Sequence, residues 1–270
     1  FSNTLAPAVC AASIKVLDML SQSTALRDKL EEIFGIKYLL PTHQGRACEH
    51  ILAQHFVKPG NCIIMNYHFT TSKAHITRLG ARVEELVKDP KVKGMFCVPK
   101  YSNPTGNTYS DETVRRLASM ECAAPDFRII WDNAYAVHDL TEDGDKLLDI
   151  FAEAEKYGNL DRIFYFSSTS KITFPGSGVA LMAASPANLK QIEKYLGVQT
   201  IGYDKLNQLR HTAYFKDETH VHEHMMMLAR FIGKKFDITL RNLDTLEGLG
   251  IAEWTKPRGG YFESLDCMAG

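Results

Sequence analysis

Short apolar runs alternate with amphipathic stretches along most of the chain. Runs rich in apolar and β-forming residues predict strands at Cys62–Met65 and at residues 127–131, 162–166 and 178–183. Apolar positions at helical spacing predict helices at residues 26–33, 47–56, 111–120 and 147–155, and mainly helical structure from 186 to 254. Ser110 is the expected N-cap of the helix at 111–120. This alternation is typical of an α/β fold with a mostly parallel sheet flanked by helices.

Three polar clusters lie just after the strand runs, at residues 102–106, 132–135 and 167–171. Ligands of such sheets bind at the carboxyl ends of the strands. Asp132 follows an apolar strand, where a carboxylate is costly to bury unless a cation meets it. Lys171 follows another strand and a run of hydroxyl residues, and a partly desolvated lysine can attack a carbonyl group. Pyridoxal phosphate needs such a lysine and an acid paired with its ring nitrogen, so these clusters suit that cofactor.

Residues 83–266 resemble the aminotransferases of fold type I, and most closely the bacterial aspartate aminotransferases called class Ic or MocR-like. The resemblance rests on eight strings: VKGM at 92–95, SNPTG at 102–106, YSDETVRRL at 109–117, APDFR at 124–128, WDNAYAVH at 131–138, STSKITF at 168–174, NQLRH at 207–211 and GGYF at 259–262. It implies the pyridoxal-phosphate-dependent transferase fold. The large domain would span residues 1–210, and residues 211–270 would begin a small C-terminal α+β domain that is incomplete here.

The resemblance also implies a role for each residue of the motifs. Lys171 would form the Schiff base, or internal aldimine, with the cofactor and then move the proton of the reaction. Asp132 would pair with the pyridinium nitrogen. Asn103 and Tyr135 would hydrogen-bond the phenolic oxygen, and Ser168 or Ser170 would bind phosphate oxygens. Alone, Asp132 could be a cap or surface ion pair and Lys171 a solvated lysine; their joint occurrence favours the cofactor site.

Residues 26–80 resemble a different branch of the same fold type, the β-eliminating lyases tryptophanase and tyrosine phenol-lyase. Gln44, Gly45 and Arg46 match the turn that opens a phosphate-binding helix in those enzymes. Free N–H groups and the helix dipole favour an anion there. Phe69 matches the aromatic residue that stacks on the pyridine ring. An ordinary core aromatic for Phe69, and a plain turn with a surface arginine for Gly45 and Arg46, remain alternatives.

Two positions discriminate between the reactions of these branches. The lyases carry an arginine where this chain has Tyr135, and a second lysine beside the Schiff-base lysine, whereas Lys171 lies between Ser170 and Ile172. Both favour an aminotransferase that moves an amino group from an amino acid, with aspartate expected, to a 2-oxo acid. A β-eliminating lyase and a non-catalytic cofactor-binding module remain alternatives. Val179 stands where many aminotransferases have a phosphate-binding arginine, and Arg46 is the expected replacement.

Charge and composition restrict the remaining classes. The 31 basic and 32 acidic residues give a net charge of −1, which argues against general nucleic-acid binding. No apolar run approaches the length of a membrane helix. The six cysteines are scattered singly, which favours buried thiols in a reducing cytoplasm.

Two further expectations concern metal binding and assembly. His220, His222 and His224 could in principle bind a metal ion, but a polar helix face is the preferred interpretation, so no metal is expected. The resemblance implies a homodimer with small-molecule substrates. The arginine that binds the substrate carboxylate in the family has no match in this chain.

Overall fold

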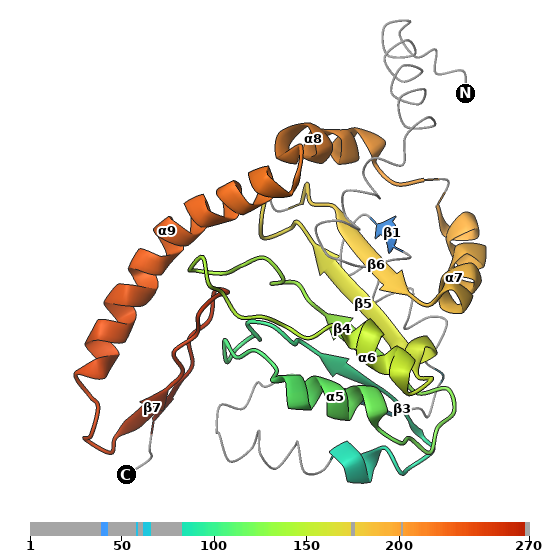
Figure 1. Ribbon diagram of the computed structural model, residues 1–270, viewed down its shortest axis with the longest axis horizontal. Coiled ribbons are helices and arrows are strands. Elements are labelled where there is room, and N and C mark those ends of the chain that lie inside the picture. Colours follow the sequence, from blue (N-terminus) through green and yellow to red (C-terminus); the bar gives the residue numbers. More distant parts are fainter. Residues whose placement is uncertain are drawn as a thin grey trace, which may run out of the picture.

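The computed structural model describes residues 39–42, 58, 62–65, 83–173, 176–200 and 202–267. Within these residues six strands form one sheet, in the order β1 (Leu39–Thr42), β6 (Ala180–Ala184), β5 (Ile163–Ser168), β4 (Arg128–Asp132), β3 (Val92–Cys97) and β2 (Cys62–Met65) (Figure 1). Strands β2 to β5 are parallel, and β6 is antiparallel to both of its neighbours. The predicted mostly parallel sheet is therefore confirmed.

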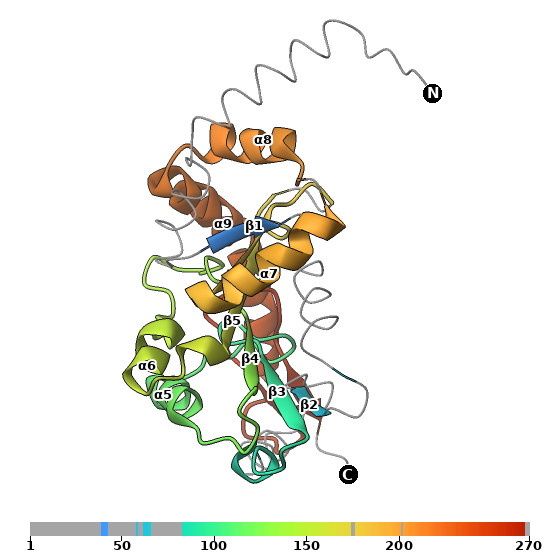
Figure 2. The same cartoon turned by 90° about the vertical axis from the view of Figure 1, so that its right-hand side faces the viewer.

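The helices of the described residues cover the sheet and extend beyond it. They are α5 (Asp111–Ser119), α6 (Ile150–Lys156), α7 (Pro186–Gln199), α8 (Lys205–Phe215) and α9 (Glu218–Asp244). Helices α5 and α6 lie together beside β3 and β4 (Figure 2). The long helix α9 runs along one side of the molecule toward a hairpin of β7 (Ala252–Trp254) and β8 (Leu265–Cys267) (Figure 1).

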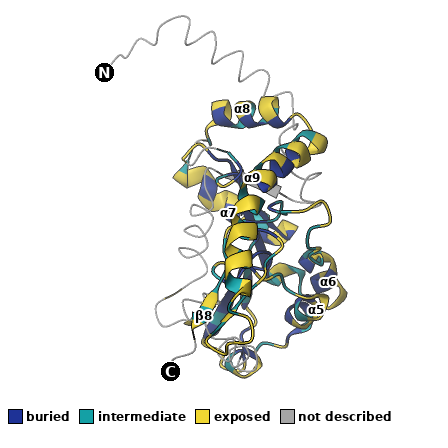
Figure 3. Cartoon of the chain, turned by 90° about the vertical axis from the view of Figure 1, so that its left-hand side faces the viewer, coloured by how far each residue is buried: buried dark blue, intermediate teal, exposed yellow. Residues whose placement is uncertain are grey.

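Pleating assigns alternate side chains of β4 and β5 to two different cores, because successive residues of a strand point to opposite faces. Trp131 and Tyr165 lie in the cluster that contains Val114 of α5, whereas Phe164 and Phe166 pack with Ile192 of α7. Helices α5 and α6 therefore cover one face of the sheet and α7 the other. The sheet is largely buried, while the outward faces of the helices are exposed (Figure 3).

Side-chain caps define where several helices begin. Ser110 Oγ accepts a hydrogen bond from the Thr113 backbone N–H, which confirms the predicted cap of α5. Asp149 caps α6, because its side chain accepts hydrogen bonds from the backbone N–H groups of Phe151 and Ala152. This cap moves the helix start to Ile150, so the prediction that it begins at 147 was wrong.

The structure also contains one strand that was not predicted and less helix near the C-terminus than was predicted. Strand β3 was not among the predicted strands, because Lys93 and Gly94 interrupt its apolar run. The prediction of mainly helical structure up to residue 254 was wrong at its end, since α9 stops at Asp244. Gly248 and Gly250 follow with φ angles of +81° and +68°, a left-handed backbone that continues no helix. The chain then turns back as β7.

The cysteines are less uniformly buried than expected. Cys97 lies in the core, and burial raises the pKa of its thiol to about 12. Cys122 is half-buried, but Cys62 and Cys267 are exposed, so the expectation of buried thiols was wrong for these two. All four are free thiols, and the remaining two cysteines lie outside the described residues.

Several expectations are not decided by the described residues. The predicted helices at 26–33 and 47–56 lie outside them. The predicted domain boundary at 210/211 falls within α8 and stays a prediction. Among the helices described, none is both long and apolar enough to cross a membrane.

Candidate functional site

Lys171 lies in the turn that joins β5 to β6, just beyond the carboxyl end of β5. The backbone N–H groups of Ile172 and Thr173 both donate to the Thr169 carbonyl at 2.9 Å, so the turn is closed around the lysine. The Lys171 Nζ atom lies 4.2 Å from the centroid of the Tyr135 ring. The sequence-predicted lysine and tyrosine are therefore in direct contact.

The surroundings of Lys171 favour its neutral amine. The residue as a whole is exposed, but protein atoms around the ammonium group exclude part of its water. This burial lowers the pKa of Lys171, and the negative charge of nearby Asp132 opposes the shift. The net direction is downward, which makes the free amine more available for attack on a carbonyl group.

Asp132 is the last residue of β4, where it is paired with Phe166 of β5. The pairing continues past the strand, because the Asn133 N–H donates to the Phe166 carbonyl at 2.8 Å. Ser167 Oγ in turn donates to the Asn133 carbonyl at 2.9 Å. Asp132 is partly buried and lies close enough to Lys171 for its charge to affect the lysine. The carboxyl ends of β4 and β5 thus bring the predicted acid and lysine together.

Tyr135 is buried in a group of rings at this edge of the sheet. Its ring centroid lies 5.6 Å from that of His138, 6.2 Å from Tyr261 and 6.1 Å from Phe262. The Tyr261 hydroxyl donates to the Lys171 carbonyl at 2.9 Å. The GGYF segment therefore packs against both the tyrosine and the lysine turn.

Removing the Tyr135 ring should be far more damaging to stability than removing its hydroxyl. Tyr135→Ala is expected to lower the free energy of unfolding by about 3–5 kcal/mol, because it leaves a cavity among packed rings. Tyr135→Phe keeps the ring beneath Lys171 and should change stability by less than about 1.5 kcal/mol. Urea denaturation of both variants measures the difference. Equal urea midpoints for the two variants would contradict the close packing of the Tyr135 ring.

Asn103 is an exposed residue in a largely buried loop that follows β3 and approaches the same group of rings. Tyr101 of this loop belongs to the Tyr135 cluster, and its hydroxyl donates to Asp139. Ser264 Oγ donates to the Pro104 carbonyl at 2.9 Å, which ties the loop to the C-terminal segment. The Asn103 side chain is itself exposed, and its contact with a phenolic oxygen stays a prediction.

The two candidate phosphate-binding serines are half-buried. Ser168 is the last residue of β5, and Ser170 lies in the turn beside Gly178. A Cβ at Gly178 would lie 2.8 Å from Ser170 Oγ, so only glycine allows this approach. Val179, which follows, is buried in the core and supplies no cation. Gln44, Gly45, Arg46 and Phe69 lie outside the described residues, and their roles stay predictions.

Two side chains near Lys171 received no role from sequence reasoning. His138 is buried, and burial together with the positive charge of Lys171 lowers its pKa to about 4, so it is neutral at pH 7. Tyr261 contacts the lysine turn, and burial raises the pKa of its hydroxyl. Both lie within the motif strings, but only the folded chain shows that they reach Lys171.

The three histidines of α9 have separate partners. His220 Nδ1 lies 2.6 Å from Asp217, His222 Nε2 lies 2.8 Å from Glu142, and His224 Nε2 lies 2.8 Å from the Ile172 carbonyl. Throughout the described ranges, no group of three histidine, cysteine or acidic side chains is placed to hold a metal ion.

Comparison with models of known protein families matches two different families to two parts of the chain, as its motifs do. The family model described as "Aspartate amino-transferase" matches residues 79–270. The chain belongs to this family. A second model, "Beta-eliminating lyase", matches residues 17–123. Both resemblances identified from the sequence are therefore confirmed.

Individual relatives agree with this division. An aspartate aminotransferase of Corynebacterium glutamicum is 48% identical over 189 residues, which cover 70% of this chain and 44% of that protein. A tyrosine phenol-lyase of Pasteurella multocida is 42% identical over 78 residues, or 29% of this chain and 17% of the relative. The chain thus spans less than half the length of these curated relatives.

Solved structures confirm the fold class. The crystal structure of an aspartate transaminase from Corynebacterium glutamicum has a TM-score of 0.82 and 35% sequence identity, covering 92% of this chain and 66% of that one. A putative aminotransferase from Corynebacterium diphtheriae has a TM-score of 0.81 and 34% identity, covering 90% of this chain and 68% of that one. The expected α/β fold of the fold type I enzymes is therefore observed.

Proposed function

We propose that this protein is a pyridoxal-phosphate-dependent aminotransferase that transfers an amino group from an amino acid, with aspartate the favoured donor, to a 2-oxo acid. The observation that carries the proposal is Lys171, whose amine lies over the Tyr135 ring and beside Asp132 with a lowered pKa. The names of the Corynebacterium relatives support aspartate as the substrate.

The residues at the carboxyl edge of β4 and β5 fit this cofactor. Lys171 offers an amine that loses its proton readily, and Asp132 offers a carboxylate for the cationic ring nitrogen. Ser168, at the end of β5, and Ser170, in the turn that follows, offer hydroxyl groups. When bound, pyridoxal phosphate supplies a carbonyl group for the amine and an electron sink for the reaction.

Four side chains of the site each have a task in the proposed reaction. Lys171 holds and moves the proton at its Nζ atom, for which a lowered pKa is an advantage. Tyr135 lies beneath this atom and keeps the amine at the sheet edge. Tyr261 covers the lysine turn through its bond to the Lys171 carbonyl and helps exclude water. Asp132 maintains a negative charge opposite the ring nitrogen.

The β-eliminating lyase is the weaker alternative. The lyase model matches residues 17–123, which end before Asp132, Tyr135 and Lys171. The part of the chain that carries these residues matches the aminotransferase model. The lyase resemblance instead covers Gln44, Gly45 and Arg46, so it bears on phosphate binding rather than on the reaction.

We also propose that the protein is a homodimer, as the family resemblance implies. The cytoplasm is the proposed location, because the six cysteines are scattered singly. The substrates would be small molecules, an amino acid and a 2-oxo acid.

The proposal is tested by purifying the full chain with pyridoxal phosphate and supplying aspartate with 2-oxoglutarate. Formation of oxaloacetate and glutamate is expected, whereas serine or an S-alkyl cysteine should release no ammonia and pyruvate. Release of those products would select the lyase instead. A folded chain that binds pyridoxal phosphate but alters no amino acid would support the non-catalytic module.

A further inference from the structure

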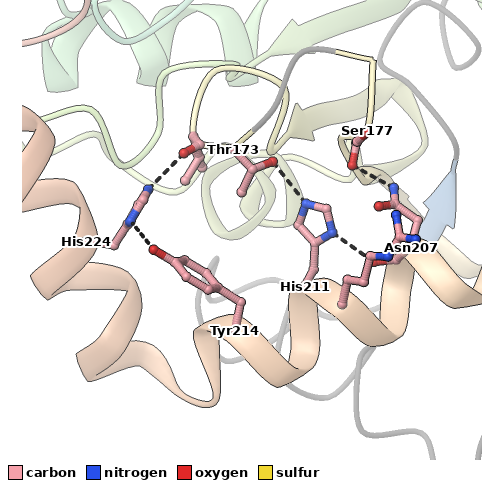
Figure 4. A pocket seen from close by; sticks show the side chains of 8 residues that line it. Thr173, Ser177, Asn207, His211, Tyr214 and His224 are labelled. Carbon is pink, nitrogen blue, oxygen red and sulfur yellow. Dashed lines mark hydrogen bonds between the residues drawn. The ribbon is translucent and has the colours of Figure 1, made fainter.

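Two threonines flank Lys171 in its turn, and both hydroxyls lie against one histidine of α8. Thr169 Oγ1 and Thr173 Oγ1 are each 3.0 Å from His211 Nε2. Figure 4 shows the contact between Thr173 and His211. On its other side, His211 Nδ1 lies 2.8 Å from the Asn207 carbonyl. A carbonyl oxygen can only accept, so Nδ1 donates to Asn207, and in this tautomer Nε2 is the acceptor.

The Thr169 hydroxyl can accept one hydrogen bond and donate another in this arrangement. It accepts a hydrogen bond from the Val179 N–H at 2.8 Å, and its own proton remains for His211. Val179 lies on the far limb of the turn, where β6 is about to begin. His211 therefore fixes, through one hydroxyl, the two limbs between which Lys171 lies.

A second side chain on the same face of α8 holds the far limb directly. Asn207 Nδ2 donates to the Ser177 carbonyl at 2.6 Å and to the Gly178 carbonyl at 3.1 Å. Residues four apart on a helix share a face, so Asn207 and His211 act side by side. Both are buried, with exposed fractions of 5% and 8%.

A pocket of about 520 Å³ lies beside this contact, and Thr173, His211, Arg210 and Tyr214 are among the residues that line it. Because a pocket lies here, packing alone does not hold this side of the turn. The turn is held by the bonds from Thr173 to the Thr169 carbonyl, by the contact with His211 on α8 and by the contact of the Ile172 carbonyl with His224 on α9.

From this geometry we propose that His211 is a positioning residue for Lys171. By accepting a hydrogen bond from Thr169, it holds the lysine turn so that the amine stays over the Tyr135 ring instead of swinging into solvent. The Thr173 hydroxyl donates to the Thr169 carbonyl and lies against the same histidine. The inference rests on the proposed function, because the positioned amine is the one that is proposed to bind the cofactor. The contact itself requires no cofactor.

The test compares His211→Leu, which removes the acceptor, with His211→Gln, whose side-chain oxygen can replace Nε2. Acetic anhydride labels lysine amines in the cofactor-free full chain, and mass spectrometry follows Lys171 as a function of pH. In His211→Leu the freed amine should be better hydrated, its pKa should rise, and its labelling rate at neutral pH should fall by about threefold, equivalent to half a pH unit. His211→Gln should restore the rate.

Ile192→Ala is the matched control, because Ile192 is buried on α7 and packs in a different cluster. It should lower stability without altering the titration of Lys171. An unchanged Lys171 titration in His211→Leu would overturn the proposal, as would an equal effect of Ile192→Ala. A His211→Gln variant that behaves like His211→Leu would overturn the acceptor role. Failure of the wild-type chain to attach pyridoxal phosphate would overturn the proposed function, yet these labelling data would still decide the role of His211.

Discussion

Replacing Lys171 with alanine should abolish covalent attachment of pyridoxal phosphate and lower transamination by about 10⁴-fold or more. The variant lacks both the amine that reacts with the carbonyl group and the base that moves the proton. Borohydride reduction followed by peptide mapping measures attachment, and a coupled assay of 2-oxo acid formation measures turnover. The residue Lys171 is exposed as a whole and its amine packs over one ring, so the variant should remain folded.

Lys190→Ala is the appropriate control, since Lys190 is exposed on α7 and distant from the site in the fold. It should attach the cofactor and turn over substrate as the wild-type chain does. Reduced cofactor found on another lysine in Lys171→Ala, with the wild-type stoichiometry, would contradict the assignment.

The pH dependence of attachment follows from the lowered pKa of Lys171. Only the unprotonated amine attacks a carbonyl, so the rate should rise with pH and level off above the Lys171 pKa. Because this pKa is depressed, the plateau should come at lower pH than for the side-chain amine of free lysine. Rates of attachment to the protein and to a free lysine derivative, measured across the same pH series, test this order.

Local sequence patterns were sufficient to predict the secondary structure around the site and the proximity of its acid and lysine. Strand β2 and the cap at Ser110 were predicted correctly, because a short apolar run and a capping hydroxyl act over a few residues. Asp132 and Lys171 could be paired in advance for a different reason. Parallel neighbouring strands end at one edge of a sheet, so residues that follow them must meet there.

The remaining parts of the site come from contacts that no local pattern encodes. Tyr261 reaches the Lys171 carbonyl across ninety residues of sequence, and His211 reaches Thr169 across 42. The burial that makes His138 neutral also arises only when several segments pack together. Their residue types signalled nothing by themselves, because lone histidines and tyrosines are common in any core.

Replacing Asp132 with asparagine should change the Lys171 pKa in the direction opposite to His211→Leu, because it removes a charge and does not release the lysine turn. Asp132→Asn removes the negative charge that opposes the fall in the Lys171 pKa, so that pKa should fall further. The labelling rate of Lys171 at neutral pH should therefore rise in the cofactor-free chain, opposite to the fall expected for His211→Leu. Turnover should drop by about 10²-fold or more, because the charge opposite the cationic ring nitrogen is lost.

Asp126→Asn provides the matched control for this variant. Asp126 is exposed and pairs with Lys93, away from the carboxyl ends of the strands. It should change neither the titration of Lys171 nor turnover. If Asp132→Asn left the Lys171 titration unchanged, the two groups would not interact as the fold implies. If it altered the titration but not turnover, Asp132 would act on the lysine alone and not on the cofactor, because a group paired with the ring nitrogen must affect catalysis.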